Sequence, residues 1–296
     1  MELRNLGVEL EALATDGSLE EEVNLRARAA ALDHIALVDE VVRLRGEDTS
    51  AAALCRQAAA LRHRLEAVDE RLFQGLRGWI RSGDYTPAAL RREFDRYTGY
   101  VPSGERPAHL GYDGLDHLID GLLCVEPVPR KTVELAPEMV HLETTPARAI
   151  LDLVDHASLT PSDVLVDIGS GLGQVAILVH LLSGIETRGI EIDPAFCRYA
   201  RRCVRALGLT GIEFVPVDAR DADYTTGTVF YLFTPFVGDM LQAVLDRLRA
   251  EARVRSIRVC TYGPCTPHVA RQPWLACYAP DPEHEFKLAV FHSRPA

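Results

Sequence analysis

The sequence predicts an α/β protein with a mostly parallel, seven-stranded sheet and a separate α-helical domain at its N-terminus. Three observations predict this fold class. Apolar residues recur at helical spacing over residues 1–125, strand and helix patterns alternate over residues 126–296, and a glycine-rich loop directly follows the first strand. We therefore expect two domains with these boundaries, the first helical and the second built around the sheet.

The N-terminal domain carries the periodicity of amphipathic helices. Residues 19–45 place apolar residues three, four and seven positions apart among charged neighbours, and residues 50–82 carry a second apolar stripe. A shorter helix is expected to begin with Thr86 as its N-cap and Pro87 in its first turn. One more short helix is expected over residues 114–124, so this domain is predicted to be a helical bundle.

The C-terminal domain begins after a proline-containing stretch, residues 125–137, that suppresses helix and marks a boundary. A helix is expected over residues 145–157. The predicted strands are residues 164–166, 188–192, 212–217, 229–233 and 256–261, followed by a terminal hairpin of residues 274–278 and 286–291. Helices are predicted between several of these strands, and such alternation implies a parallel sheet that is covered on both faces.

Composition excludes several classes of protein. With 47% hydrophobic and 25% charged residues the chain resembles an ordinary globular protein. No apolar stretch reaches the roughly 20 residues of a membrane span, and residues 1–11 carry no secretory signal, so we expect a cytoplasmic protein that does not bind membranes. A net charge of −11 argues against nucleic acid as a partner. Seven cysteines without CxxC spacing predict reduced thiols and no metal site.

A glycine loop follows the first strand directly and opens into an apolar helix. Its residues are Asp167, Ile168, Gly169, Ser170, Gly171, Leu172, Gly173 and Gln174. Glycines allow a ligand to approach the backbone closely, and the helix end offers unpaired N–H groups. A nicotinamide dinucleotide is one candidate, because Gly171, Gly173 and Ala176 fit G-x-G-x-x-A and Glu191 lies downstream. The carboxylate of Asp167 would repel a pyrophosphate, however, and suits a cationic ligand better.

This loop resembles the first motif of the class I S-adenosylmethionine-dependent methyltransferases, in which an acid precedes G-x-G-x-G. Further matching motifs follow the next three strands, at residues 189–193, 217–219 and 232–236. The resemblance implies a Rossmann-like sheet and S-adenosylmethionine as the cofactor. It also implies that Asp167 and the glycines lie near the methionine part of the cofactor, that Glu191 binds the ribose hydroxyls, and that Asp218 with Ala219 meets the adenine.

Within that class, the cofactor half resembles the seven-strand histone lysine methyltransferases. Glu143, Thr144 and Thr145 stand ahead of the first strand in that family's relation to the glycine loop, and the likeness covers residues 138–200. It fades at residues 233–236, which replace an asparagine-containing motif, so we expect a bacterial enzyme acting on a small molecule, with secondary metabolism one setting for it. The expected cofactor contacts are Glu143, Thr144, Asp167, Gly169, Gly171, Gly173, Gln174, Glu191, Asp218, Ala219, Thr234, Pro235 and Phe236.

Catalytic candidates follow from the chemistry of a sulfonium. Methyl transfer is an in-line displacement, so the protein mainly aligns the acceptor and excludes water. Aromatic rings stabilise a sulfonium by cation–π attraction, which makes Tyr100, Tyr112 and Tyr231 candidates, together with Phe236 from the expected cofactor contacts. His141, two residues from Glu143, is the expected base for an acceptor that must lose a proton. Packing of these rings and helix capping by Glu143 remain open alternatives.

Other functions also remain open. We expect residues 1–125 to form a lid or substrate wall, or to make a homodimer through their long helices. An azetidine-forming or nicotianamine-synthase-like enzyme would use the same cofactor but attack its aminobutyryl carbon and release methylthioadenosine. A non-catalytic scaffold is less favoured, because scaffolding alone does not require four cofactor motifs.

Overall fold

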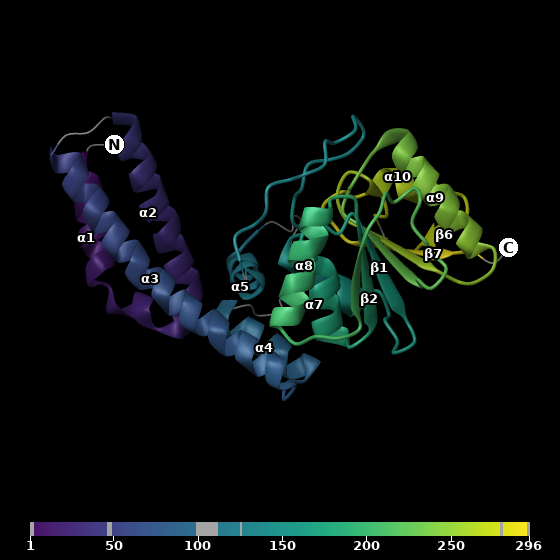
Figure 1. Ribbon diagram of the computed structural model, residues 1–296, viewed down its shortest axis with the longest axis horizontal. Helices are drawn as coiled ribbons and strands as arrows, with labels where there is room; N and C mark the ends of the chain where they lie inside the picture. Colours follow the sequence, from purple (N-terminus) through teal and green to yellow (C-terminus); the bar gives the residue numbers. More distant parts are fainter. Residues whose placement is uncertain (1–2, 46–48, 99–111, 125, 279–280, 295–296) are drawn as a thin grey trace. The chain divides into compact units, whose positions relative to one another are not determined.

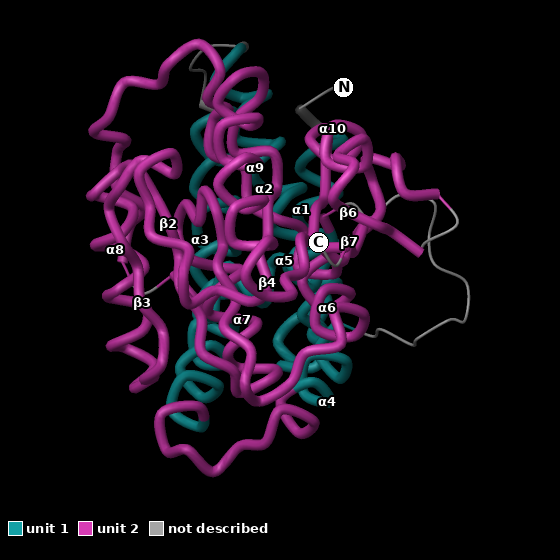
Figure 2. Tube along the Cα trace, turned by 90° about the vertical axis from the view of Figure 1, so that its right-hand side faces the viewer, with its two compact units in different colours: residues 1–79, 91–102, 113–122 teal, residues 80–90, 103–112, 123–296 magenta. Residues whose placement is uncertain are grey.

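The structure is a computed structural model that describes residues 3–45, 49–98, 112–124, 126–278 and 281–294. The chain forms two compact units, shown in two colours in Figure 2. One comprises residues 1–79, 91–102 and 113–122, and the other comprises residues 80–90, 103–112 and 123–296. The longest part of the second unit, residues 123–296, begins within a few residues of the predicted boundary at residue 125, but the unit also includes residues 80–90 and 103–112 of the predicted helical domain.

The first unit is helical. Its main elements are α1 (Leu3–Thr15), α2 (Leu25–Arg45), α3 (Thr49–Ser82), α4 (Pro87–Thr98) and α5 (Gly114–Leu123), with the last turn of α3, the first turn of α4 and the last residue of α5 counted in the second unit. Helices α1, α2 and α3 pack side by side around buried leucines such as Leu6, Leu10 and Leu65 (Figure 1). The predicted start of α4 is confirmed, because Thr86 Oγ1 accepts a hydrogen bond from the backbone N–H of Ala89.

A buried ion pair crosses the interior of the first unit. Arg28 is fully buried, and its Nε lies 2.5 Å from Oδ1 of Asp69. The other guanidinium nitrogens donate to backbone carbonyl oxygens, including those of Leu19 and Glu21. The second oxygen of Asp69 lies 3.0 Å from Nε2 of His117. Because every charged group in this cluster has partners, its burial is compatible with a stable fold.

The second unit is built on the predicted seven-stranded sheet. Its strands are β1 (Val164–Ile168), β2 (Glu186–Glu191), β3 (Ile212–Pro216), β4 (Val229–Leu232), β5 (Arg258–Thr261), β6 (Leu275–Cys277) and β7 (Ala289–Ser293). Their order is β3-β2-β1-β4-β5-β7-β6, and β7 runs antiparallel to the other six strands. From β1 the chain adds β2 and β3 on one side of the sheet and then returns to add β4 on the other side of β1, so the strand order switches between β1 and β4. Such a switch opens a crevice at the carboxyl ends of the strands, where ligands bind in sheets of this kind.

Helices cover both faces of this sheet (Figure 1). They are α6 (Ala147–His156), α7 (Gln174–Ser183), α8 (Pro194–Ala206), α9 (Gly238–Ala252) and α10 (Thr266–Ala270). Val166 and Phe230 point to the face that packs on α9, in one apolar cluster with Val244. Among the described helices, none combines the length and the apolar character that crossing a membrane requires.

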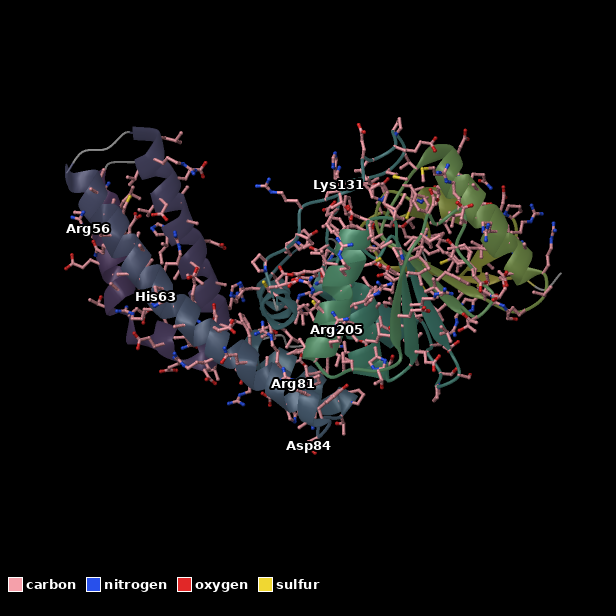
Figure 3. The ribbon with its side chains drawn as sticks, viewed as in Figure 1. Arg56, His63, Arg81, Asp84, Lys131 and Arg205 are labelled. Atoms are coloured by element: carbon pink, nitrogen blue, oxygen red, sulfur yellow. The ribbon has the colours of Figure 1, made fainter. Side chains whose placement is uncertain are left out.

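Residues 80–90 join the second unit through the end of α8. Arg81 donates two hydrogen bonds, of 2.9 and 2.6 Å, to the backbone carbonyl of Ala206, the last residue of α8. Figure 3 labels Arg81 with its neighbour Arg205 at this end of α8. A side chain that satisfies a helix's terminal carbonyl is a C-terminal cap, and a positive charge suits the helix dipole there.

Candidate active site

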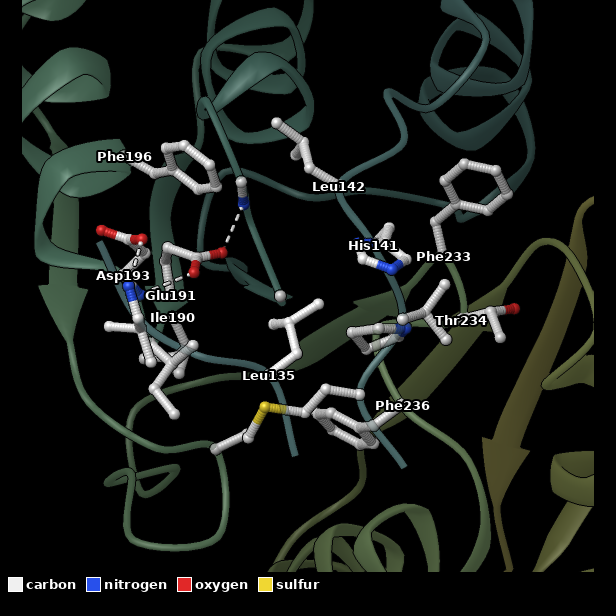
Figure 4. Close-up of a pocket in the computed structure, with 18 of the residues that line it drawn as sticks. Leu135, His141, Leu142, Ile190, Glu191, Asp193, Phe196, Phe233, Thr234 and Phe236 are labelled. Carbon is white, nitrogen blue, oxygen red and sulfur yellow. Dashed lines mark hydrogen bonds between the residues drawn. The ribbon is translucent and has the colours of Figure 1, made fainter. Parts of the chain in front are cut away.

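A cavity of about 180 Å³ lies at the carboxyl edge of the sheet (Figure 4). Among the predicted residues, those that line it are His141, Glu143, Gly169, Gly171, Glu191, Asp218, Ala219, Thr234, Pro235 and Phe236. A smaller cavity of about 30 Å³ is lined by the predicted residues Glu143, Thr144, Asp167, Gly169, Gly171 and Gln174. The two cavities are neighbouring parts of one site, because five residues border both. These are Leu142, Glu143, Gly169, Gly171 and Phe233.

The glycine loop brings the backbone to the cavity wall. Gly169 and Gly171 have φ angles of +82° and +52°, which L side chains rarely adopt. A Cβ atom at Gly169 would lie 2.3 Å from the Cβ of Pro235, and one at Gly171 would lie 2.5 Å from Leu142. Only glycine therefore allows the loop after β1 to approach the loop after β4 so closely.

Gly173 was predicted as a cofactor contact, but it lines neither cavity. Its φ angle is +87°, and a Cβ atom there would lie 2.5 Å from the ring of Phe214 and 2.7 Å from Ala200. The requirement for glycine at this position therefore comes from packing at the start of α7, and the spacing of the motif alone could not distinguish the two roles.

Glu191 ends β2 and is held in a fixed orientation. The backbone N–H of Gly171 donates to its Oε2 at 2.9 Å, and the backbone N–H of Asp193 donates to its Oε1 at 2.7 Å (Figure 4). Burial raises the pKa of this carboxyl above its ordinary value, although the two backbone bonds oppose that shift. Each oxygen keeps a further lone pair, so the carboxylate can accept hydrogen bonds from two adjacent hydroxyls.

Asp167 is the last but one residue of β1 and has no partner for its Oδ2 atom among the described residues. It is 3% exposed, and burial, reinforced by the negative charge of Glu191, raises its pKa to about 8. Ser170 Oγ and Gln174 Oε1 are likewise buried without a partner in the described chain. All three residues line the smaller cavity, and the oxygens of Asp167 and Gln174 can accept hydrogen bonds from a ligand that donates there. An ammonium group fits that requirement and would also favour the ionised form of Asp167.

Asp218 follows β3 and is already paired. Its two oxygens lie 3.1 and 2.8 Å from the Nε and Nη2 atoms of Arg220, and this ion pair holds the pKa of the carboxyl below its usual value. Each carboxylate oxygen can accept more than one hydrogen bond. The ion pair therefore leaves room for a ligand amino group in the larger cavity, which Asp218 and Ala219 both line.

The loop after β4 presents aromatic rings and uses its own polar atoms internally. Thr234 has a φ angle of +40°, and its Oγ1 accepts from the backbone N–H of Cys265 at 3.0 Å. The carbonyl of Pro235 accepts from the backbone N–H of Val140 at 3.1 Å. The ring of Phe233 packs on Tyr262 with centroids 5.3 Å apart. The wall at this end of the site is thus formed by an aromatic ring.

The four predicted catalytic residues have different outcomes. His141 lines the larger cavity, between Leu142 and Phe233 in Figure 4. The hydroxyl of Tyr112 donates to the backbone carbonyl of Thr144 at 2.6 Å, so Tyr112 contacts one of the expected cofactor residues through its oxygen. Tyr100 lies outside the described residues.

Tyr231 needs a correction. It is fully buried in the body of β4, its hydroxyl lies 3.4 Å from Thr145 Oγ1, and it lines neither cavity. Burial raises its pKa well above the ordinary value. The cause is its position. Tyr231 lies within β4, where it pairs with Asp167 in register, and Phe233, two residues later in the loop after β4, is the aromatic residue that lines the cavity.

The outer wall of the larger cavity is residues 131–143, which we call the strap. It contributes eight of the lining residues: Lys131, Val133, Leu135, Met139, Val140, His141, Leu142 and Glu143. Sequence reasoning treated residues 125–137 only as a boundary and missed the first three. The alternation of Val133 and Leu135 among polar neighbours in a proline-containing stretch was the available signal of an extended segment with one apolar side.

Comparison with known proteins places this site in a family context. Residues 133–227 match the family described as "Histone methylation protein DOT1". That match contains most of the strap, the glycine loop and β1 to β3, and it stops before β4, where the sequence resemblance fades. The second unit has the class I methyltransferase fold. With the strand order and the orphaned atoms at the β1 end, the match confirms the predicted enzyme class and cofactor: an S-adenosylmethionine-dependent methyltransferase.

Solved structures with limited similarity to this chain include an RNA methyltransferase from Salinibacter ruber in complex with S-adenosyl-L-homocysteine. It is 23% identical, with a TM-score of 0.40, over 52% of this chain and 94% of that one. A geranyl diphosphate C-methyltransferase from Streptomyces coelicolor A3(2) is 19% identical, with a TM-score of 0.34, over 43% of this chain and 48% of that one. Among curated proteins, none matches the chain.

Proposed function

We propose that this chain transfers the methyl group of S-adenosylmethionine to a small-molecule acceptor that lies against Phe233 and His141. The observation that carries the proposal is the pair of neighbouring cavities at the strand ends, with orphaned acceptors in one and an aromatic wall shared by both. When bound, S-adenosylmethionine supplies a methyl carbon activated by a sulfonium.

The residues divide between the two ends of the cofactor. Asp167 and Gln174 offer unpartnered oxygens to the amino-acid end, and Thr144 lines the same small cavity. Glu191 offers its carboxylate to the ribose. Ala219, Phe236 and Met240 supply apolar surface for the base.

The acceptor end of the site supports a small-molecule acceptor through its aromatic wall. The hydroxyl of Thr234 and the carbonyl of Pro235 each already accept one backbone hydrogen bond, and the ring of Phe233 lines both cavities beside them. An aromatic wall favours a flat or apolar acceptor. If the attacking atom carries a proton, the imidazole of His141 can take it, since a general base must stand on the wall of the reacting cavity.

The experiment is to incubate the purified full chain with methyl-labelled S-adenosylmethionine, alone and with sets of phenolic, heteroaromatic and amine acceptors. Label in an acceptor together with S-adenosylhomocysteine supports the proposal. Methylthioadenosine formed without any acceptor would support the cyclase or aminocarboxypropyl alternative instead. Label found only in added histone or RNA would overturn the small-molecule assignment.

The role of residues 1–125 as a lid or substrate domain stays a prediction, as does a homodimer. Hydrogen exchange over this range, measured with and without S-adenosylhomocysteine, tests the first. Protection of these helices on binding is the expected result, and unchanged exchange would instead favour a separate partner-binding role. Sedimentation of the full chain tests the second.

A further inference from the structure

We propose that Asp193 is a positioning residue that fastens the strap over the cofactor cavity, and that release of this fastening sets how fast the cofactor enters and leaves. The inference concerns residues 131–133 and the start of α8. It rests on the assignment of the cavity to S-adenosylmethionine.

The strap depends on its end contacts for its conformation. Residues 131–143 contain no helix and only an isolated bridge, between Met139 and Phe236. An irregular segment lacks the internal hydrogen bonds of a helix or sheet, so the bonds that it makes to neighbouring elements must hold it. A ligand behind this wall is released when one of those attachments opens.

The first attachment is the carboxylate of Asp193. Its Oδ2 accepts from the backbone N–H groups of Thr132 at 2.5 Å and Val133 at 3.1 Å, and its Oδ1 accepts from the Thr132 hydroxyl at 2.6 Å. The same carboxylate caps α8, because Oδ1 also accepts from the backbone N–H of Ala195 at 2.8 Å. Asp193 is 2% exposed, whereas Thr132 lies at the surface, so these bonds join a buried carboxylate to an exposed part of the strap.

The second attachment involves more of the chain. The carboxylate of Glu138 accepts from the backbone N–H groups of Asp239 and Met240 at 3.0 and 2.8 Å, at the start of α9. Its backbone carbonyl accepts from Val237 at 2.9 Å. Gly238 has a φ angle of +61°, and a Cβ atom there would lie 2.3 Å from Glu138 Oε1. Glu138, in the middle of the strap, is held by backbone and side chain together, whereas residues 132 and 133 depend on a single carboxylate. The Asp193 end is therefore the one that can open.

Asp193 also connects the strap to the expected ribose site. Its backbone N–H donates to Glu191 Oε1 at 2.7 Å, while its side chain holds Thr132. A ligand bound to Glu191 and a fastened strap consequently favour the same conformation of residues 191–193. Ligand binding should then strengthen the fastening, because two interactions that favour one conformation reinforce each other.

Two variants and one matched control test this proposal. Asp193→Asn keeps a good N-cap for α8 but removes the charge that binds the strap. Thr132→Val removes only the hydroxyl and leaves both backbone donors in place. Thr225→Val is the control, because Thr225 Oγ1 donates to Asp223 Oδ1 at 2.8 Å in an exposed turn that borders neither cavity.

The measurements are the association and dissociation rates of S-adenosylhomocysteine by stopped-flow, and hydrogen exchange of residues 131–143 without ligand. We expect dissociation to be about ten- to a hundredfold faster in Asp193→Asn and about three- to tenfold faster in Thr132→Val. Exchange at residues 132 and 133 should rise in both variants. Thr225→Val should match the wild type.

Unchanged rates and unchanged strap exchange in both variants would overturn the proposal. A lowered melting temperature with wild-type rates would overturn it too, because Asp193 would then only cap α8. If the wild-type chain binds no S-adenosylhomocysteine at all, the cofactor assignment itself fails, which calorimetry on the wild type distinguishes from a failure of the fastening.

Discussion

Asp163 and Asp167 lie at the two ends of β1, both almost completely buried, and their surroundings are opposite. Asp163 accepts hydrogen bonds from Arg258, Thr228 and Thr160. Burial alone would raise its pKa, but these bonds outweigh burial and hold the pKa far below the ordinary value. Asp167 has an oxygen with no partner among the described residues, and its pKa is raised to about 8.

The two aspartates show that the amino edge of the sheet serves stability and the carboxyl edge serves ligand binding. At the amino edge, every bond of the aspartate lies within the protein, so its charge contributes to stability. At the carboxyl edge, a carboxyl group is buried at a cost that a ligand can offset. Functional sites commonly retain such unfavourable groups, since the complementary interaction is made on binding.

The largest effect is expected from Asp163→Asn. The change removes the charge that compensates Arg258, whose side chain is only 14% exposed. Breaking a buried pair in this way costs about 3–5 kcal/mol of unfolding free energy. Urea denaturation of variant and wild type at neutral pH measures it. A loss below about 1 kcal/mol would mean that this edge is not the stabilising one.

Asp167→Asn should affect ligand binding, whereas Asp163→Asn affects stability. We expect roughly ten- to a hundredfold weaker binding of S-adenosylmethionine by calorimetry, from the loss of a charge-assisted hydrogen bond. Glu191→Ala should weaken binding by a similar factor. Wild-type affinity in both variants would remove the basis of the site assignment.

The unfolding free energy of the ligand-free protein should depend on pH through the carboxyl group of Asp167. Because the folded-state pKa of Asp167 lies above its unfolded value, its contribution is fully present below pH 4 and is lost as the pH rises towards 8. The asparagine in Asp167→Asn does not titrate. The unfolding free energy of this variant should therefore increase relative to that of the wild type as the pH rises from 4 to 8. Thermal unfolding at pH 5 and pH 8 gives the comparison, and a constant difference would contradict it.

Binding should depend on pH for a related reason. A cationic ligand group beside Asp167 requires the ionised carboxylate, so the wild-type affinity should rise between pH 6 and 7.5, by up to about tenfold per pH unit. Calorimetry in buffers of different ionisation enthalpy should detect a released proton. Asp167→Asn is the control, and an equal pH slope in that variant would assign the proton to another group.

The smallest effect is expected from Tyr112→Phe, which removes the hydroxyl that donates to the Thr144 carbonyl at 2.6 Å and lies 3.3 Å from Glu143 Oε1. Tyr112 is 53% exposed, so its bond contributes about 0.5–1.5 kcal/mol at most. We expect cofactor affinity to fall less than about tenfold, with an unchanged melting temperature. A loss of stability without a change in affinity would show that the ring has a packing role only.

Much of the carboxyl edge could be predicted because parallel strands all end on one side. Asp167, Glu191 and Asp218 each follow a recognisable strand, so their order along the chain already indicates that they meet. The amino edge could not be predicted in this way, since the partner of Asp163 is Arg258, 95 positions away. The link between Thr132 and Asp193 has the same origin, with 61 positions between its residues.

Local patterns also fail where packing decides between roles. Gly173 belongs to the motif, yet the ring of Phe214 explains its glycine. Tyr231 has the residue type for a sulfonium contact, but its place within β4 buries it. In both cases the residue type fits two roles, and only the three-dimensional neighbours distinguish them.

The border between the two cavities has a consequence for inhibitor chemistry. Leu142 lies beside Gly171 there and, like Phe233, lines both cavities; Leu142 is 44% exposed, so its side chain can rotate away at little cost. A compound that joins an adenosine to an acceptor mimic would have to place its linker at this border. Selectivity over other enzymes with the same cofactor would then come from the linker and from Phe233, because the nucleoside half meets features that such enzymes share.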